Sequence, residues 1–122
     1  MSRTQALNDT LEHLQSGSGD IEACAIVSED GLMIASSLAP NIEEAQIAAM
    51  SAAMLSMGTR TALELKRGNL EQLFVRGDNG YVIIMHAGEH AVLIALARKT
   101  AKLGLVFLDL SRASQEVKKI LG

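Results

Sequence analysis

The 122-residue sequence contains no tryptophan, one tyrosine and two phenylalanines, and cysteine and proline occur once each. The three aromatic side chains, Phe74, Tyr81 and Phe107, are too few to form the stacking platforms that bind single-stranded nucleic acids. The lone Cys24 excludes an internal disulfide framework and gives no zinc-binding pattern. Because Cys24 lies within an apolar run, we interpret it as a small buried hydrophobe.

The sequence also carries little charge: charged residues make up 20% of it, and the net charge is −3. Without a basic cluster, the chain lacks the electrostatic signature of a nucleic-acid-binding protein. The hydrophobic fraction of 48% is typical of one globular domain, spanning residues 1–122, whose core needs neither metal nor disulfide. No signal-peptide run opens the sequence, and the longest uncharged run, residues 45–59, is too short to span a membrane. We therefore expect a cytoplasmic protein.

The motifs of common catalytic sites are missing as well. The sequence contains neither a GxxxxGK[ST] phosphate-binding loop nor a GxSxG nucleophile elbow. His86 and His90 flank a turn at Gly88 and are placed to face each other across a hairpin. Glu89 is the sole further ligand nearby, and a tight turn directs it to solvent, so these histidines do not indicate a metal site. We predict no catalytic, cofactor-binding or metal-binding residues, and hence a protein that is not an enzyme.

Hydrophobic periodicity and turn signals predict three helices and five strands. Leu7, Leu11 and Leu14 recur at helical spacing, and Asp30-Gly31 between two apolar runs is a strong hairpin signal. The predicted helices cover residues 2–15, 42–66 and 101–121. The predicted strands cover residues 23–28, 32–37, 70–76, 81–86 and 91–97.

Two of the predicted strands indicate how these elements are layered. Residues 82–85 and 91–97 are continuously apolar, which is typical of strands buried on both faces. The predicted fold class is therefore α/β, more strictly α+β. It has a five-stranded, mainly antiparallel sheet and the order helix-strand-strand-helix-strand-strand-strand-helix. We expect the two terminal helices to cover one face of the sheet and the long middle helix to cover the other.

The middle helix has an unusual composition, because residues 45–59 contain no charge. A helix that covers a sheet normally buries one stripe and exposes a polar one. Here one stripe consists of Ile47, Met50, Met54, Met57 and Thr61. A second stripe consists of small residues, namely Ala45, Ala48, Ala49, Ala52, Ser56 and Thr59. The helix is either enclosed in a monomer core or, as we favour, packs one stripe on the sheet and the other on a partner chain.

The strand at residues 70–76 is the most polar of the last three, and we expect it at the sheet edge, where unpaired backbone groups favour pairing with a symmetry mate. The sequence therefore predicts a homodimer joined through the middle helix and this strand. The predicted interface residues are Ala48, Met50, Ala52, Met54, Met57, Gly58, Thr61, Leu73, Phe74 and Val75.

These features resemble the Roadblock / dynein light chain family. Residues 25–36, AIVSEDGLMIAS, are similar to the "vvs-dGl-ias" hairpin of that family, and residues 68–72, 79–82 and 101–106 fit its pattern in order and spacing. The resemblance implies a Roadblock, profilin-like fold and a homodimer. It also implies a similarity to prokaryotic members of the mutual gliding protein B type, which bind Ras-like small GTPases and regulate their nucleotide cycle. Eukaryotic relatives serve dynein and lysosomal scaffolds.

By this resemblance, we expect a prokaryotic, non-catalytic regulator or scaffold of a Ras-like GTPase. The predicted GTPase contacts are Glu43, Gln46, Arg60, Glu64 and Arg67. Arg60 invites comparison with an arginine finger, but its spacing from Glu64 favours a surface ion pair. Two alternatives are a small-molecule sensor of PAS or GAF type, which needs a pocket between helix and sheet, and an enzyme.

Overall fold

The computed structural model describes residues 2–122, and these residues form three helices and five strands. In chain order the elements are α1 (Arg3–Gly17), β1 (Ile21–Ser28), β2 (Met33–Ser37), α2 (Glu44–Glu64), β3 (Gln72–Gly77), β4 (Gly80–His86), β5 (Ala91–Arg98) and α3 (Leu103–Leu121). All eight predicted elements are confirmed, and their ends lie within two residues of the expected positions.

The five strands form one sheet in the order β2-β1-β5-β4-β3, and every neighbouring pair is antiparallel. Tight turns join β1 to β2, β3 to β4 and β4 to β5, as their short connections predict. The first and last strands of the order, β2 and β3, are the two edges of the sheet. The expected edge position of β3 is therefore confirmed.

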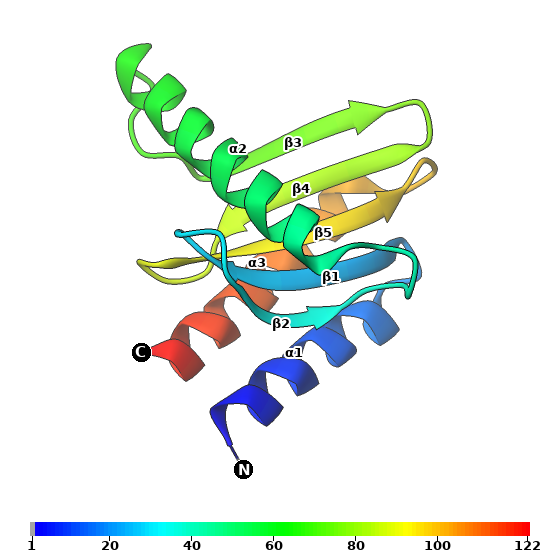
Figure 1. The fold of residues 1–122 in the computed structure, drawn as a ribbon. Helices are drawn as coiled ribbons and strands as arrows, with labels where there is room; N and C mark the ends of the chain where they lie inside the picture. Colours follow the sequence, from blue (N-terminus) through cyan, green and yellow to red (C-terminus); the bar gives the residue numbers. More distant parts are fainter. Residues whose placement is uncertain (1) are drawn as a thin grey trace.

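The helices cover the two faces of the sheet unequally (Figure 1). α1 and α3 lie side by side on one face and enclose the larger core cluster, which includes Leu11, Ile83 and Leu110. α2 alone crosses the other face, over a smaller cluster that includes Leu55 and Ile84. Neighbouring residues of one strand, such as Ile83 and Ile84, thus enter opposite core layers. This confirms the prediction that the central strands are buried on both faces.

The chain leaves α2 through two residues in left-handed backbone conformations, Lys66 (φ 60°) and Gly68 (φ 84°). The backbone N–H of Arg67 donates to the carbonyl of Ala62 at 2.7 Å, so the last carbonyls of the helix are satisfied as the chain turns. This ending reverses the chain direction and delivers it to β3, at the sheet edge closest to the end of α2 (Figure 1).

Cys24 lies in the larger core cluster with 1% of its surface exposed, which confirms its interpretation as a buried hydrophobe. Its Sγ is 3.6 Å from the carbonyl oxygen of Leu11, to which the thiol donates a weak hydrogen bond. Burial raises the pKa of the Cys24 thiol from 9.0 to about 12. The thiol therefore stays protonated in the folded protein at neutral and moderately alkaline pH.

This raised pKa predicts a loss of stability in alkali. Above pH 9.0 the unfolded chain releases the thiol proton, whereas the folded chain retains it up to about pH 12. The free energy of unfolding should therefore fall by about 1 kcal/mol between about pH 8 and about pH 10 on account of this group. The measurement is urea denaturation of the wild type and Cys24→Ala at both pH values. The variant should lack this part of the decline, and equal declines in the two proteins would contradict the prediction.

Candidate functional site

The most unusual surface of the molecule lies on α2. Of its 21 residues, Ala48, Ser51 and Leu55 are the ones buried. Large apolar side chains of the helix and of its C-terminal end are more than half exposed: Met50 by 52%, Met57 by 62%, Leu63 by 54% and Leu65 by 65%. A single helix lying on a sheet normally shows a polar outer face. Exposure of several large apolar side chains on one helix of a folded domain is typical of an interaction surface.

The two stripes of α2 point to opposite flanks of the helix. Met54 and Met57 face β3, where they line an apolar groove. The stripe of small residues faces the β1–β2 turn instead, where a Cβ added to Gly31 would lie 3.6 Å from the Cβ of Ala52. The small residues thus let α2 lie close to its own hairpin. The methionine stripe is the one left open on the other flank.

The groove between the C-terminal half of α2 and β3, here called the edge groove, has a volume of about 430 Å³. Gly58 brings the helix close to the strand, since a Cβ at this position would lie 3.2 Å from Leu70 Cδ2 and 3.3 Å from Leu73 Cδ2. The edge groove is lined by Met54, Met57, Gly58, Thr61, Ala62, Leu65, Arg67, Leu70, Leu73 and Val75. Apart from Thr61 and Arg67, all of these residues are apolar.

β3 is exposed on both of its faces as well as along its outer edge. Val75 lines the edge groove on the α2 side and is 47% exposed. Phe74 points to the α3 side, where its ring centroid lies 5.9 Å from that of Phe107, and it is still 48% exposed. Within residues 2–122, β4 is the one strand that pairs with β3. A partner that covers this strand therefore has to supply a backbone edge and apolar groups on both faces.

The ten residues predicted for a dimer interface do not all belong to this surface. Ala48 is 2% exposed and packs in the smaller core cluster under α2, so it has no surface left for another chain. Ala52 lies on the flank that faces Gly31, away from β3. We leave these two residues out of the surface at β3, because the stripe of small residues packs towards the hairpin of its own chain. The other eight lie on β3, along the edge groove, or one turn before it at Met50.

The five predicted GTPase contacts are all exposed and lie towards the two ends of α2. Glu43 and Gln46 lie at its start, whereas Arg60, Glu64 and Arg67 lie at or just after its end. Arg60 Nε is 2.9 Å from Glu64 Oε1, which confirms the expected surface ion pair. Arg67 lines the edge groove, so it borders the apolar surface.

The two histidines near the β4–β5 turn are not cross-strand partners, because His86 pairs with Val92 in the register of the two strands. His90 Nδ1 lies 2.9 Å from Glu29 Oε1 of the β1–β2 turn, an interaction between two turns far apart in sequence. Among residues 2–122, no group of three or more His, Cys, Asp and Glu side chains is arranged to hold a metal ion. In the same part of the chain, every buried side-chain nitrogen and oxygen has a hydrogen-bond partner.

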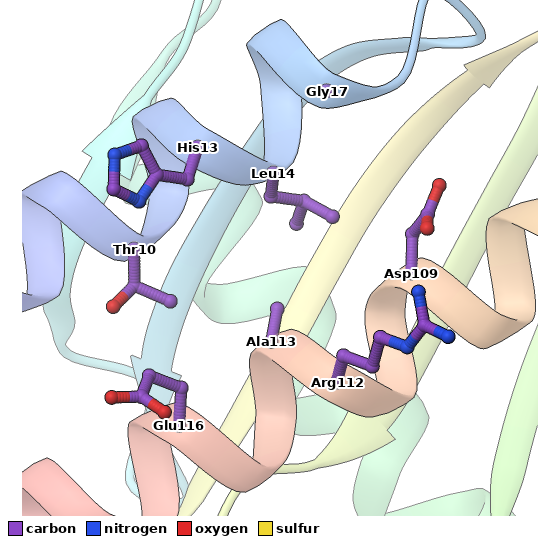
Figure 2. Close-up of a pocket in the computed structure, with 8 residues that line it drawn as sticks. All are labelled: Thr10, His13, Leu14, Gly17, Asp109, Arg112, Ala113 and Glu116. Carbon is purple, nitrogen blue, oxygen red and sulfur yellow. The ribbon is translucent and has the colours of Figure 1, made fainter.

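A second depression, of about 360 Å³, lies between α1 and α3 on the face opposite α2 (Figure 2). Leu14 and Ala113 form its floor, and polar side chains of both helices stand around it. Its polar residues are Thr10, His13, Asp109, Arg112 and Glu116. All five are at least partly exposed, so the depression is an open surface with a polar rim.

No helix within residues 2–122 combines the length and the hydropathy needed to traverse a bilayer.

Comparison with known proteins gives the family. The family model described as Roadblock/LC7 domain matches residues 7–97. The protein named "Uncharacterized protein MJ1340", from Methanocaldococcus jannaschii, is 34% identical over 98 residues, which cover 80% of this chain and 85% of that protein.

Solved structures share the fold at lower sequence identity. The gliding protein MglB from Thermus thermophilus is 22% identical, with a TM-score of 0.86 over 98% of this chain and 91% of that one. A structure described as MglB with tetrameric arrangement is 21% identical, with a TM-score of 0.87 over 98% and 90% of the two chains. Since the family model runs from within α1 to the penultimate residue of β5, the chain belongs to the Roadblock/LC7 family.

Proposed function

We propose that this chain acts in the cytoplasm as a non-catalytic homodimer that regulates or scaffolds a Ras-like small GTPase. The observation that carries the proposal is the continuous apolar surface formed by α2, the edge groove and both faces of β3. Exposed apolar surface of this kind favours association, because its burial releases water from both partners. The family resemblance supplies the nature of the second partner.

A second copy of the chain suits this surface better than an unrelated extended peptide would. A lone added strand pairs with the β3 edge but leaves Met50 and Leu65 on α2 exposed. A symmetry mate brings its own β3 to the edge and its own α2 beside the first helix. Antiparallel pairing of two β3 strands about a two-fold axis joins two five-stranded sheets and covers apolar groups on both faces. In this proposal the interface contains Met50, Met54, Met57, Gly58, Thr61, Leu73, Phe74 and Val75.

The GTPase partner is proposed from the family and from the outer face of α2. Gln46 and Arg60 each lie seven residues from Ala53, and Glu64 lies four residues after Arg60. The three side chains therefore share the helix face that points away from the sheet. Two such helices side by side would present an apolar centre with a charged rim, which is the anatomy of a protein interface. MglB proteins share this fold and are described as gliding proteins, which agrees with a regulatory role. One GTPase would then straddle the helix pair.

A small-molecule sensor has less support. PAS-like and GAF-like sensors need a pocket between the sheet and its covering helix. Here Ala48, Ser51 and Leu55 fill that space, and the hollows along α2 are open to the surface.

The first test concerns self-association. Wild-type protein should sediment at roughly micromolar concentration as a species of twice the 13.0 kDa chain mass. Met57→Glu should weaken the dimer at least about a hundredfold, because it buries an unpaired carboxylate in the interface. Met57 is 62% exposed in the single chain, so the fold of the monomer should not change.

Leu108→Glu is the matched control, since Leu108 is an exposed apolar residue on α3, across the sheet from α2. This variant should dimerise like the wild type, with both proteins compared by sedimentation equilibrium and far-ultraviolet circular dichroism. A wild type that stays at 13.0 kDa, or a Met57→Glu protein that dimerises normally, would refute the proposed interface.

The second test concerns the GTPase. A Ras-like small GTPase from the source organism, loaded with GTP or GDP, should be retained by immobilised wild type and lost with Met57→Glu. Arg60→Ala with Glu64→Ala should reduce retention about tenfold. Their ion pair is exposed, so its removal costs at most about 0.5 kcal/mol of stability. A reduced retention of the GTPase would therefore indicate lost contacts with the GTPase and not unfolding. Equal binding by the monomeric variant would exclude a surface shared by two subunits, and no binding of either nucleotide form would exclude the regulator role for that GTPase.

A further inference from the structure

A third groove lies under the C-terminal half of α2, on the flank opposite the edge groove. We call it the turn groove, because the β1–β2 turn forms one wall and the end of β4 closes it, while α2 forms the other wall. Its volume of about 650 Å³ exceeds that of the edge groove. It is complete within one chain and faces away from β3, so the proposed pairing of β3 strands would leave it open.

The α2 side of the turn groove consists mainly of small and aliphatic side chains. Ala52, Leu55 and Ser56 line it, and Leu63 also lines it with 54% of its surface exposed. The hairpin of the same chain already lies against Ala52. Further along this flank Ser56 and Thr59 are small enough to let a partner backbone approach the helix, at the 8–10 Å axis separation of packed helices. From Ala52 to Leu63 the helix rises about 17 Å, or about three turns. The α2 side thus has the length of a short partner helix.

The rim of the turn groove is acidic on both sides. Glu29 and Asp30 stand on the β1–β2 turn, and Glu64 stands on α2 across the groove. Arg60 is the single Lys or Arg side chain lining it, and it is already paired with Glu64 at 2.9 Å. Its three carboxylates and one guanidinium give this rim a formal net charge of −2. The rim therefore attracts a cationic partner and repels an acidic one.

The wall formed by the turn is held in place by specific contacts. The Oγ of Ser28 accepts a hydrogen bond from the backbone N–H of Leu32 at 3.0 Å, and Gly31 adopts the left-handed conformation that the turn requires. Glu29 Oε1 also contacts His90 Nδ1, which ties this turn to the β4–β5 turn. A rigid wall loses little conformational entropy on binding, which favours recognition of a partner of fixed shape.

We propose that the turn groove binds a short amphipathic helix of a partner protein, with aliphatic side chains on its inner face and Lys or Arg side chains along its borders. The aliphatic side chains would lie against Leu55 and Leu63, and the cationic ones would meet Glu29, Asp30 and Glu64. This inference depends neither on the homodimer nor on the identity of the GTPase, because one chain supplies every residue of the groove. It gives each subunit a second binding surface that adjoins the outer face of α2 and shares Arg60 and Glu64 with it.

The test uses two synthetic peptides of about 14 residues with the same leucine pattern at helical spacing. One carries lysine at its polar positions and the other carries glutamate. Binding to the full chain is measured by fluorescence anisotropy, and the binding surface is mapped by amide chemical shifts. The lysine peptide should bind, and its largest shifts should fall around Ala52–Leu63 and the β1–β2 turn. The glutamate peptide should bind at least about tenfold more weakly.

Three variants separate the groove from general electrostatic attraction. Glu29→Lys with Asp30→Lys, and separately Leu63→Ser, should each weaken the lysine peptide about tenfold. Glu12→Lys with Glu22→Lys changes the charge at two exposed acidic residues away from the turn groove, and it should weaken binding by less than about threefold. Thermal melting checks that each variant is folded.

Met57→Glu connects this result to the dimer proposal: a monomeric variant should bind the lysine peptide as well as the wild type. Equal losses in the turn-groove and control variants, shifts centred on the α1–α3 depression, or equal binding of the glutamate peptide would overturn the proposal. Failure of the lysine peptide to bind at millimolar concentration would overturn it as well.

Discussion

The structure depends on one constraint: its central strands are apolar on both faces, so both faces of a single sheet need a cover. Alternate residues of β5, such as Leu93 and Ile94, enter different core clusters. Three helices are available, and two of them, α1 and α3, occupy the same face. α2 alone must serve the other face, and one helix of about 10 Å diameter does not span five strands set about 4.8 Å apart. The uncovered area lies at β3.

The lack of charge on α2 follows from this unequal division. Its inner residues pack on the sheet through Ala48, Ser51 and Leu55, and its flanks border two grooves of different chemistry. The edge groove is apolar almost throughout, which suits a partner that repeats the same surface. The turn groove combines small and aliphatic side chains of α2 with an acidic rim, which suits a different partner of opposite charge. A single helix thereby separates two kinds of recognition on its two flanks.

Much of this arrangement could be predicted before the structure was known. The periodicity of hydrophobic residues and the glycine-containing turns indicated all eight elements. The strands that are continuously apolar indicated the layers, and the polarity of residues 70–76 indicated the edge position of β3. The Arg60–Glu64 pair followed from helical spacing alone. The positions of Ala48 and Ala52 away from β3 could not be predicted, because helical periodicity separates two stripes without indicating which one faces the chain's own hairpin. The interaction of His90 with Glu29 joins residues 61 positions apart, and no local pattern encodes it.

The sequence by itself determined which residues are helical, which are extended and which strands must be buried, because these depend on local periodicity and turn chemistry. It also determined that α2 carries more apolar surface than one contact requires. Tertiary structure decided where that surface lies: the side of α2 that stays open depends on how the helix crosses the sheet and on the close approach of Ala52 to Gly31. The grooves likewise arise where α2 meets β3, the β1–β2 turn and the end of β4, and their shape depends on contacts between segments distant in sequence.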